Sequence, residues 1–193
     1  MINDICVIIT AAGLSLRNPG KLLMDIEGVS VISRVVSLFV NLPLDVILVT
    51  GNDQNQVIDH IDSNYIKKIQ IVHNTHYHTG LSSSIKYGVA ESKSEYKYFG
   101  FCNGDKPFIQ VATVTKLVNI LDSKRPDILV PVYEKTPGHP VFFQRKYKND
   151  LINLKGDTGA RQLIKKYQDS VNFKKVNDEG IITDMDSYLN KKY

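Results

Sequence analysis

Cysteine is scarce in this chain. The two that occur, Cys6 and Cys102, lie inside short apolar stretches and have no partner at the spacing of a zinc site. Two cysteines also give no disulfide framework of the kind that small secreted domains use. We therefore expect both residues to be core thiols of a cytoplasmic protein.

Long hydrophobic runs are missing as well. No stretch approaches the roughly 20 apolar residues that a membrane-spanning helix needs. The N-terminal segment MINDICVIIT is acidic where a signal peptide is basic, and its apolar part is short. The sequence thus predicts a cytoplasmic protein with no membrane partner.

The chain also lacks long runs of one charge. Lysine and arginine number 24 against 20 aspartates and glutamates, which gives a formal net charge of +4, but the basic residues are scattered. Scattered basic residues do not suggest a nucleic-acid partner. A small anionic substrate suits this balance equally well.

What the chain does contain is an alternation of short β-branched runs with longer amphipathic stretches. Five runs are apolar nearly throughout, as in strands covered on both faces: ICVIIT, DVILVT, KIQIV, YFGFC and DILVPV. Between them, apolar residues recur three and four apart, as in helices: Val31, Val35, Leu38 and Phe39 form one set. The pattern predicts an α/β fold, a three-layer sandwich around a mostly parallel, Rossmann-like mixed sheet. With 193 residues, 42% of them hydrophobic, one domain over residues 1–193 is expected.

The pattern changes after Pro131. The segment PVYEKTPGHPVFFQRKY predicts an extended excursion with two prolines around His139, followed by a strand. Further on, Asp157 or Thr158 is a candidate N-cap for a helix over GARQLIKKY. The C-terminal segment NFKKVNDEGIITDMDSYL predicts a strand, a turn at residues 179–180 and a second strand.

Polar loops follow three of the predicted strands. They read AAGLSLRNPGK, THYHTGLSSS and NGDKPF. Ligands of open parallel sheets bind outside the carboxyl ends of the strands. The three loops therefore predict one shared site.

The first of these loops is neither of the two familiar phosphate-binding loops. A Walker A loop ending in Gly20 and Lys21 needs glycine at position 15, and a dinucleotide-binding loop needs its second glycine there, but the residue is Ser15. What remains is a small-residue turn, Ala11–Gly13, whose backbone amides can approach phosphates closely, with Arg17 and Lys21 supplying charge. A tight turn with solvated basic residues is the alternative interpretation.

The other two loops add further candidates. Asp105, directly after a buried strand, suits Mg²⁺ held jointly with substrate phosphates, or a simple Asp-Lys-Pro turn. The serines at positions 82–84 can cap a helix or bind a ligand. The histidines at positions 73, 76 and 78 match no helical ligand pair, and no cysteine joins them, so we do not predict a metal site there.

Six segments taken together resemble one family. In chain order they are AAGLSLRNPGKLL, NTHYHTGLSSSIKYG, NGDKPF, GHPVFFQRKY, GDTGAR and DMDSYL. They resemble the molybdenum-cofactor cytidylyltransferases, which belong to the nucleotidyltransferases with a glycosyltransferase-A-like, nucleotide-diphospho-sugar transferase-like fold. The resemblance spans nearly the whole chain, and the combination of GHP with GDTGAR is specific to this branch.

The resemblance implies a reaction and its participants. CMP would pass from CTP to molybdopterin, with or without molybdenum, and pyrophosphate would be released with Mg²⁺ as the cofactor. A molybdenum hydroxylase apoenzyme is the further partner that it implies.

The resemblance also implies how the phosphates are bound. Arg17 and the amides around Ala12 and Gly13 would hold the β- and γ-phosphates, and Lys21 would lie beside the α-phosphate. Ala11 and Ala12 stand where guanylyltransferase relatives tend to have glycines, which favours CTP over GTP.

For the metal, the resemblance implies Asp105 as a ligand, with Asp184 or Asp186 as a second carboxylate. For the base or ribose it implies Asn74, Ser83 and Ser84. The residues implied on the pterin side are His139, Asp157 and Arg161.

Two alternatives stay open at this stage. The first is a nucleotidyltransferase acting on another phosphate monoester, such as a sugar or isoprenoid phosphate, against which only GHP and GDTGAR argue. The second is a non-catalytic accessory protein that binds the cofactor for a molybdenum hydroxylase. The short RNPGK loop keeps the second alternative open, because the family usually reaches its lysine one residue later.

Overall fold

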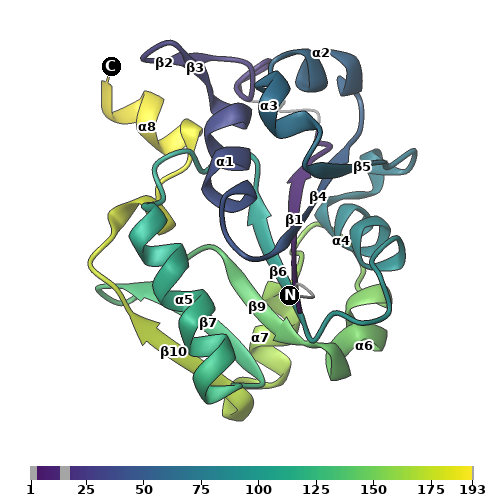
Figure 1. Cartoon of the computed structure of the whole chain (residues 1–193), viewed down its shortest axis with the longest axis vertical. Coiled ribbons are helices and arrows are strands. Elements are labelled where there is room, and N and C mark those ends of the chain that lie inside the picture. Colours follow the sequence, from purple (N-terminus) through teal and green to yellow (C-terminus); the bar gives the residue numbers. More distant parts are fainter. Residues whose placement is uncertain (1–3, 14–17, 193) are drawn as a thin grey trace.

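A single mixed sheet forms the centre of the molecule (Figure 1). The computed structural model describes residues 4–13 and 18–192. The strands lie in the order β10-β7-β9-β6-β1-β4-β5, and β8 pairs with β7. Their bounds are β1 Ile5–Ala11, β4 Asp45–Thr50, β5 Ile69–His73, β6 Tyr98–Asn103, β7 Ile128–Tyr133, β8 Thr136–Pro137, β9 Val141–Gln144 and β10 Val171–Lys175. All five strands predicted from apolar runs are confirmed.

The pairing is parallel for most of the sheet. Strand β1 pairs parallel with both β4 and β6, β4 with β5, and β10 with β7. Strand β9 runs antiparallel between β6 and β7, and the short β8 is antiparallel to β7. The sheet is therefore mostly parallel and mixed, as predicted. The carboxyl ends of β1 and β6 lie side by side at one edge, where Thr10 is in register with Asn103.

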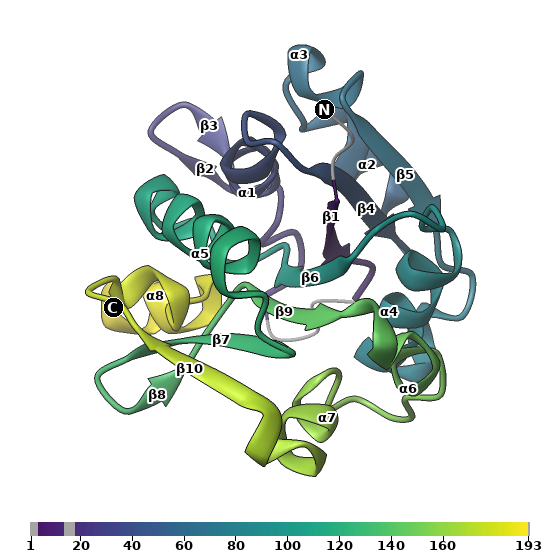
Figure 2. The same cartoon turned by 60° about the horizontal axis from the view of Figure 1, so that its bottom comes forward.

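Helices cover both faces of the sheet (Figure 2). One face carries α1 (Val31–Val40), α2 (Gln54–Asp59), α3 (Ser63–Ile66), α5 (Val111–Lys124) and α8 (Met185–Lys192). The other carries α4 (Leu81–Ala90), α6 (Lys148–Ile152) and α7 (Arg161–Lys166). A small hairpin of β2 (Asp25–Ile26) and β3 (Val29–Ser30) precedes α1. Nowhere in residues 4–13 and 18–192 does a helix have the length and apolar character that crossing a membrane requires.

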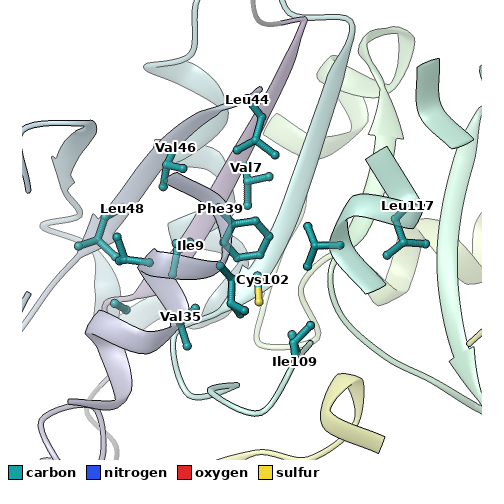
Figure 3. Packing of buried hydrophobic residues seen from close by; sticks show 14 of the residues in the cluster. Val7, Ile9, Val35, Phe39, Leu44, Val46, Leu48, Cys102, Ile109 and Leu117 are labelled. Atoms are coloured by element: carbon teal, nitrogen blue, oxygen red, sulfur yellow. The ribbon is translucent and has the colours of Figure 1, made fainter. Parts of the chain in front are cut away.

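Two hydrophobic cores follow from the alternation of side chains along the strands. On β1, Val7 and Ile9 face the α1 side, whereas Cys6 and Ile8 face the α4 side, and all four are fully buried. Figure 3 shows Phe39 of α1 packed close to Val7 and Ile9. These two cores on opposite faces make the three-layer sandwich that the sequence predicted.

Both cysteines are buried free thiols, as expected. Burial raises the pKa of the Cys6 thiol to about 12. Cys102 lies in the core on the α1 side of the sheet, where burial also raises its pKa. Neither thiol is ionised near neutral pH, so neither is a reactive nucleophile.

The C-terminal prediction of a second strand is wrong. After β10 and the short 3₁₀ turn Glu179–Ile181, the chain forms helix α8. The Ser187 amide donates to Asp184 Oδ1 (2.8 Å), and the Asp184 amide donates to Ser187 Oγ (3.0 Å). This reciprocal capping starts the helix where the apolar pair Ile181 and Ile182 suggested a strand.

The predicted N-cap before α7 is also wrong. The cap position of α7 is Ala160, which offers no side-chain acceptor. The Asp157 carboxylate instead accepts a hydrogen bond from the Leu81 amide (2.9 Å), at the first turn of α4. The serines predicted as possible caps of α4 lie inside the helix, and its cap position is Gly80.

Candidate functional site

A cleft of about 720 Å³ opens at the carboxyl ends of β1 and β6. All three polar loops singled out in the sequence contribute to it. The first loop supplies the segment Ala11–Gly13, the loop after β6 supplies Asp105, and the segment Tyr77–Leu81 comes from the loop before α4. The three loops therefore meet at one cleft, where the sequence predicted a shared site.

The first loop is backed closely by the end of β4. A Cβ atom placed on Gly51 would lie 2.4 Å from the carbonyl oxygen of Ala12, so no side chain fits between the two segments. Ala12 is buried, whereas Gly13 is exposed and has no neighbour near a would-be Cβ. Ala12 is thus packed against Gly51, and the backbone at Gly13 is open toward the cleft. Arg17, predicted beside the β- and γ-phosphates, lies outside the described residues.

The described part of the first loop ends in a tight turn over Asn18, Pro19, Gly20 and Lys21. The Lys21 amide donates to the Asn18 carbonyl (3.2 Å), and Gly20 has a φ of 75°. Proline followed by a glycine with positive φ fits a type II turn. The turn places Lys21 in the lining of the cleft and Asn18 against Asp186, which also lines it.

Lys21 joins two carboxylates from distant parts of the chain. Its Nζ lies 2.5 Å from Asp105 Oδ2 and 3.1 Å from Asp186 Oδ2. All three side chains are largely buried, with 11%, 16% and 10% of their surface exposed. Burial opposes the charge of the ammonium, but the two carboxylates outweigh it and raise the pKa of Lys21. The lysine therefore keeps its positive charge in the lining of the cleft.

The carboxylates also have the chemistry of a magnesium site. Asp105 Oδ1 is buried and has no hydrogen-bond partner within the described ranges. In the same ranges, no group of three or more His, Cys, Asp or Glu side chains is arranged to hold a metal. Mg²⁺ typically takes one or two protein carboxylates and completes its shell with water and phosphate oxygens. Asp105 and Asp186 fit that demand.

Of the two C-terminal aspartates left open by the sequence, Asp186 is the one at the cleft. Asp184 instead caps α8 through Ser187. Its Oδ2 lies 3.8 Å from the ammonium of Lys106, the lysine that follows Asp105. The Met185 amide donates to the Asp105 carbonyl (3.0 Å), which fixes the start of α8 against the loop after β6.

Asn74 and Ser83, predicted to face the base or ribose, lie behind the wall of the cleft. Asn74 is fully buried, and its Nδ2 donates to the hydroxyls of Ser83 (2.8 Å) and Ser84 (3.2 Å). The Ser83 hydroxyl donates in turn to the Gly80 carbonyl (2.8 Å). Among the described residues that line the cleft, Ser84 is present and the other two are absent. The buried Asn74 amide therefore stabilises the first turns of α4. Of the three residues, Ser84 is the one that lines the cleft.

Asp157 lies on the rim of the same cleft. Its carboxylate accepts a hydrogen bond from the Leu81 amide. The carbonyl of the preceding residue, Gly156, accepts one from the Ser82 amide (3.2 Å). A Cβ on Gly80 would lie 3.0 Å from the Gly156 carbonyl oxygen. The loop thus satisfies the first amides of α4, which have no partner inside the helix.

A second cavity of about 390 Å³ adjoins the first and shares Thr10, Leu81 and Asn103 with it. Two of the residues predicted on the pterin side, His139 and Arg161, line this second cavity. The third, Asp157, lines the larger cleft instead.

His139 is held neutral. Its Nδ1 lies 3.2 Å from the Phe101 carbonyl oxygen, so Nδ1 carries the proton and Nε2 keeps its lone pair. Burial and the positive charge of Lys106 lower the pKa of His139 to about 4. The second cavity is therefore given a hydrogen-bond acceptor rather than a cation at this position.

Sequence reasoning gave no role at the site to three residues that lie at or beside it, Asn18, Tyr77 and His78. Asn18 donates to Asp186 Oδ1 (2.7 Å), and the Asn-Pro-Gly-Lys turn was the signal that could have located it. Tyr77 and His78 also line the cleft, with ring centroids 5.8 Å apart in an edge-on arrangement. No periodicity marks these two residues, because they lie in a loop.

Comparison with known proteins gives one family and consistent structural neighbours. The family model described as a MobA-like NTP transferase domain matches residues 7–171. The chain is 26% identical over 158 residues to the molybdenum cofactor cytidylyltransferase of Escherichia coli (strain K12), a match that spans 81% of this chain and 79% of that protein.

Among the solved structures with a similar fold are two mycobacterial proteins. A homologue of Mycobacterium tuberculosis Rv0371c from Mycobacterium sp. strain JC1 has a TM-score of 0.83 at 21% identity, covering 100% of this chain and 95% of that one. Rv0371c from M. tuberculosis H37Rv, in complex with manganese, has a TM-score of 0.80 at 20% identity and covers 97% of each chain. The predicted fold class, a sheet of the glycosyltransferase-A-like kind, is confirmed.

Proposed function

This chain belongs to the MobA-like NTP transferase domain family, and on that premise we propose that it transfers CMP from CTP to molybdopterin and releases pyrophosphate. The observation that carries the proposal is the Lys21 ammonium, buried between two carboxylates at the base of a cleft formed by three polar loops. Transfer between two anions needs charge neutralisation and alignment above all, and this site supplies fixed charge of both signs.

The proposed transfer needs no covalent enzyme intermediate. An oxygen of the terminal phosphate of molybdopterin attacks the α-phosphorus of CTP and forms the new phosphoanhydride bond. The bond between the α-phosphorus and the oxygen that bridges to the β-phosphate breaks in line, and pyrophosphate leaves with that electron pair. Negative charge grows on the α-phosphate and on the bridging oxygen during this step, so a nearby ammonium stabilises it.

We assign that ammonium to Lys21. It lies in the loop whose open backbone, Ala12 and Gly13, faces the same cleft. We expect those amides to bind the β- and γ-phosphates, with Arg17 as a further cation.

We assign Mg²⁺ to the carboxylates of Asp105 and Asp186. When bound, the ion neutralises phosphate charge and orients the triphosphate. The buried, unpartnered Asp105 Oδ1 supports this assignment. The manganese in the structural neighbour from M. tuberculosis is consistent with it.

We assign the acceptor to the second cavity, which opens beside the first at Thr10 and Asn103. Its lining includes the apolar side chains Phe101 and Phe173 as well as the guanidinium of Arg161. A flat ring system with an anionic tail suits such a mixture. The neutral His139 offers Nε2 to a hydrogen-bond donor of the ring.

Release of pyrophosphate tests the proposal. The purified protein is supplied with Mg²⁺, molybdopterin and each of the four NTPs in turn. We expect release with CTP that depends on molybdopterin. Release with a sugar or isoprenoid phosphate in place of molybdopterin would favour a different acceptor. Binding of the cofactor without release from any nucleotide would favour an accessory protein that delivers it to a molybdenum hydroxylase.

A further inference from the structure

The turn at the end of the first loop contacts both carboxylate oxygens of Asp186. Asn18, the first residue of the turn, donates from Nδ2 to Asp186 Oδ1 (2.7 Å). Lys21, the fourth residue, approaches Asp186 Oδ2 (3.1 Å). The two contacts span 168 and 165 residues of sequence. We call the Asn18–Lys21 turn with these two contacts the Asp186 clamp.

We propose that Asn18 is a positioning residue that fixes the orientation of the Asp186 carboxylate and so sets the divalent-metal affinity of the cleft. The inference rests on the proposed function, in which Asp186 and Asp105 hold the ion. Asn18 itself is assigned no contact with the metal, the nucleotide or the acceptor.

The orientation of a buried carboxylate depends on the hydrogen bonds that its two oxygens accept. Asp186 has only 10% of its side chain exposed, so water does little to satisfy Oδ1. An amide that donates to Oδ1 holds the plane of the carboxylate, which leaves Oδ2 on the side of Lys21 and Asp105. Hydrogen bonds of this kind to ligating carboxylates typically change metal affinity by about 10- to 100-fold.

The turn makes this arrangement specific to the local sequence. Proline and glycine at the centre of the turn place its first and fourth residues side by side, and the backbone bond from Lys21 to Asn18 closes it. A residue without a side-chain donor at position 18 would remove the hydrogen bond to Oδ1 and shift Asp186 toward its ion pair with the ammonium of Lys21. The metal would then compete with a stronger ion pair.

The clamp also joins the first loop to the C-terminal helix. The family match ends at residue 171, so Asp186 and helix α8 lie beyond it. The backbone bond from Met185 to Asp105 fixes where α8 begins, and the clamp fixes how its first turn faces the cleft. Metal binding therefore depends on contacts between the phosphate loop and the C-terminal helix.

The test is a calorimetric titration of the whole chain with Mg²⁺ alone, in the absence of nucleotide and acceptor. Asn18→Ala should bind Mg²⁺ about tenfold or more weakly than the unchanged protein. Asn18→Leu keeps the branched shape without a donor and should give the same loss, which guards against a packing effect of the smaller residue. Asn153→Ala is the matched control, because its Nδ2 donates to a backbone carbonyl outside the cleft (2.8 Å), and it should bind Mg²⁺ normally.

A double-mutant cycle separates positioning from general loosening of the loop. In an Asp186→Asn background, which removes the carboxylate to be positioned, Asn18→Ala should change Mg²⁺ affinity less than about twofold. An equal loss in both backgrounds would overturn the proposal, because Asn18 would then act without Asp186. Unchanged affinity in Asn18→Ala and Asn18→Leu would overturn it directly, as would absence of Mg²⁺ binding to the unchanged protein.

Measurements of turnover distinguish a failure of the clamp from a failure of the proposed function. Mg²⁺-dependent pyrophosphate release from CTP, together with normal Mg²⁺ affinity in the Asn18 variants, would overturn the clamp alone. Failure of the unchanged protein to release pyrophosphate would count against the proposed function whatever the metal titration gives.

Discussion

The ammonium of Lys21 lies 2.5 Å from the carboxylate of Asp105, across 84 residues of sequence. The cation of the phosphate loop thus neutralises the carboxylate to which we assign the metal. An ammonium and a divalent ion cannot occupy the same oxygens together, since their charges repel strongly at such distances. If Asp105 and Asp186 hold Mg²⁺ as we propose, we expect the Lys21 ammonium to turn toward the phosphates when the ion binds.

Replacing Lys21 is therefore expected to have two opposite effects. Lys21→Met should lower turnover by roughly 100-fold or more, because the developing charge on the α-phosphate loses its partner. The same variant should bind Mg²⁺ about tenfold or more tightly in the absence of nucleotide, because the competing cation is gone. Steady-state kinetics and calorimetry measure the two effects.

The control for Lys21→Met is Lys93→Met, which removes the same charge from an exposed ion pair with Asp45. It should alter neither turnover nor Mg²⁺ affinity. Near-normal turnover of Lys21→Met would remove the lysine from the reaction. Weaker Mg²⁺ binding in that variant would contradict the competition.

Asp105→Asn should abolish both activity and the response to Mg²⁺. The amide keeps the size of the side chain but cannot bind the ion as a carboxylate does. Pyrophosphate release as a function of Mg²⁺ concentration is the measurement, with the exposed Asp122→Asn on α5 as the control. Turnover that Mg²⁺ still stimulates in Asp105→Asn would put the metal elsewhere.

Asp157 should matter for the stability of α4. Its carboxylate accepts from the Leu81 amide, so Asp157→Ala should lower the free energy of unfolding by about 1 kcal/mol. Asp157→Asn keeps an oxygen acceptor and should lose less. Urea unfolding measures both, with the neighbouring exposed Thr158→Ala as the control. Equal stability of Asp157→Ala and Thr158→Ala would show that the cap contributes nothing.

His139 should make stability depend on pH in the mildly acidic range. Its pKa is about 4 in the folded chain and about 6.5 in the unfolded one, so between these values the unfolded state binds more protons. The contribution of neutral His139 to the free energy of unfolding is therefore present above about pH 6.5 and is lost as the pH falls toward 4. Between pH 7 and pH 5 the free energy of unfolding should fall by about 2 kcal/mol.

Urea unfolding at pH 7 and at pH 5 measures this loss. His139→Gln does not titrate, and it should lose about 2 kcal/mol less than the unchanged protein over the same interval. If both proteins lose the same amount, the acid sensitivity comes from other groups.

The sheet was predictable because its signals are local. Continuous β-branched runs such as residues 5–10 and 45–50 are typical of strands covered on both faces, and β1 and β4 follow them. The carboxyl-end rule then located the cleft without any knowledge of the strand order. Helix α8 was missed although its signal was also local: an aspartate followed three residues later by a serine, Asp184 and Ser187, is a capping pattern.

The details of the site depend on contacts that no local pattern encodes. Asp157 caps a helix 76 residues away rather than the one that follows it. Asn74 has the polarity of a ligand-binding residue, yet packing against Ser83 and Ser84 buries it completely. The partner of Asn18 lies near the opposite end of the chain. Such pairings are set by how elements pack, which the sequence expresses only through the whole fold.

The proposed transfer can be tested by following the α-phosphate of CTP. CTP labelled with ³²P at the α-phosphate is incubated with the protein, Mg²⁺ and molybdopterin, and the pterin products are separated and counted. We predict label in a cytosine dinucleotide form of the pterin, in an amount equal to the pyrophosphate released, and none with the Lys21→Met variant. Label that stays in CTP while the pterin remains bound to the protein would contradict it.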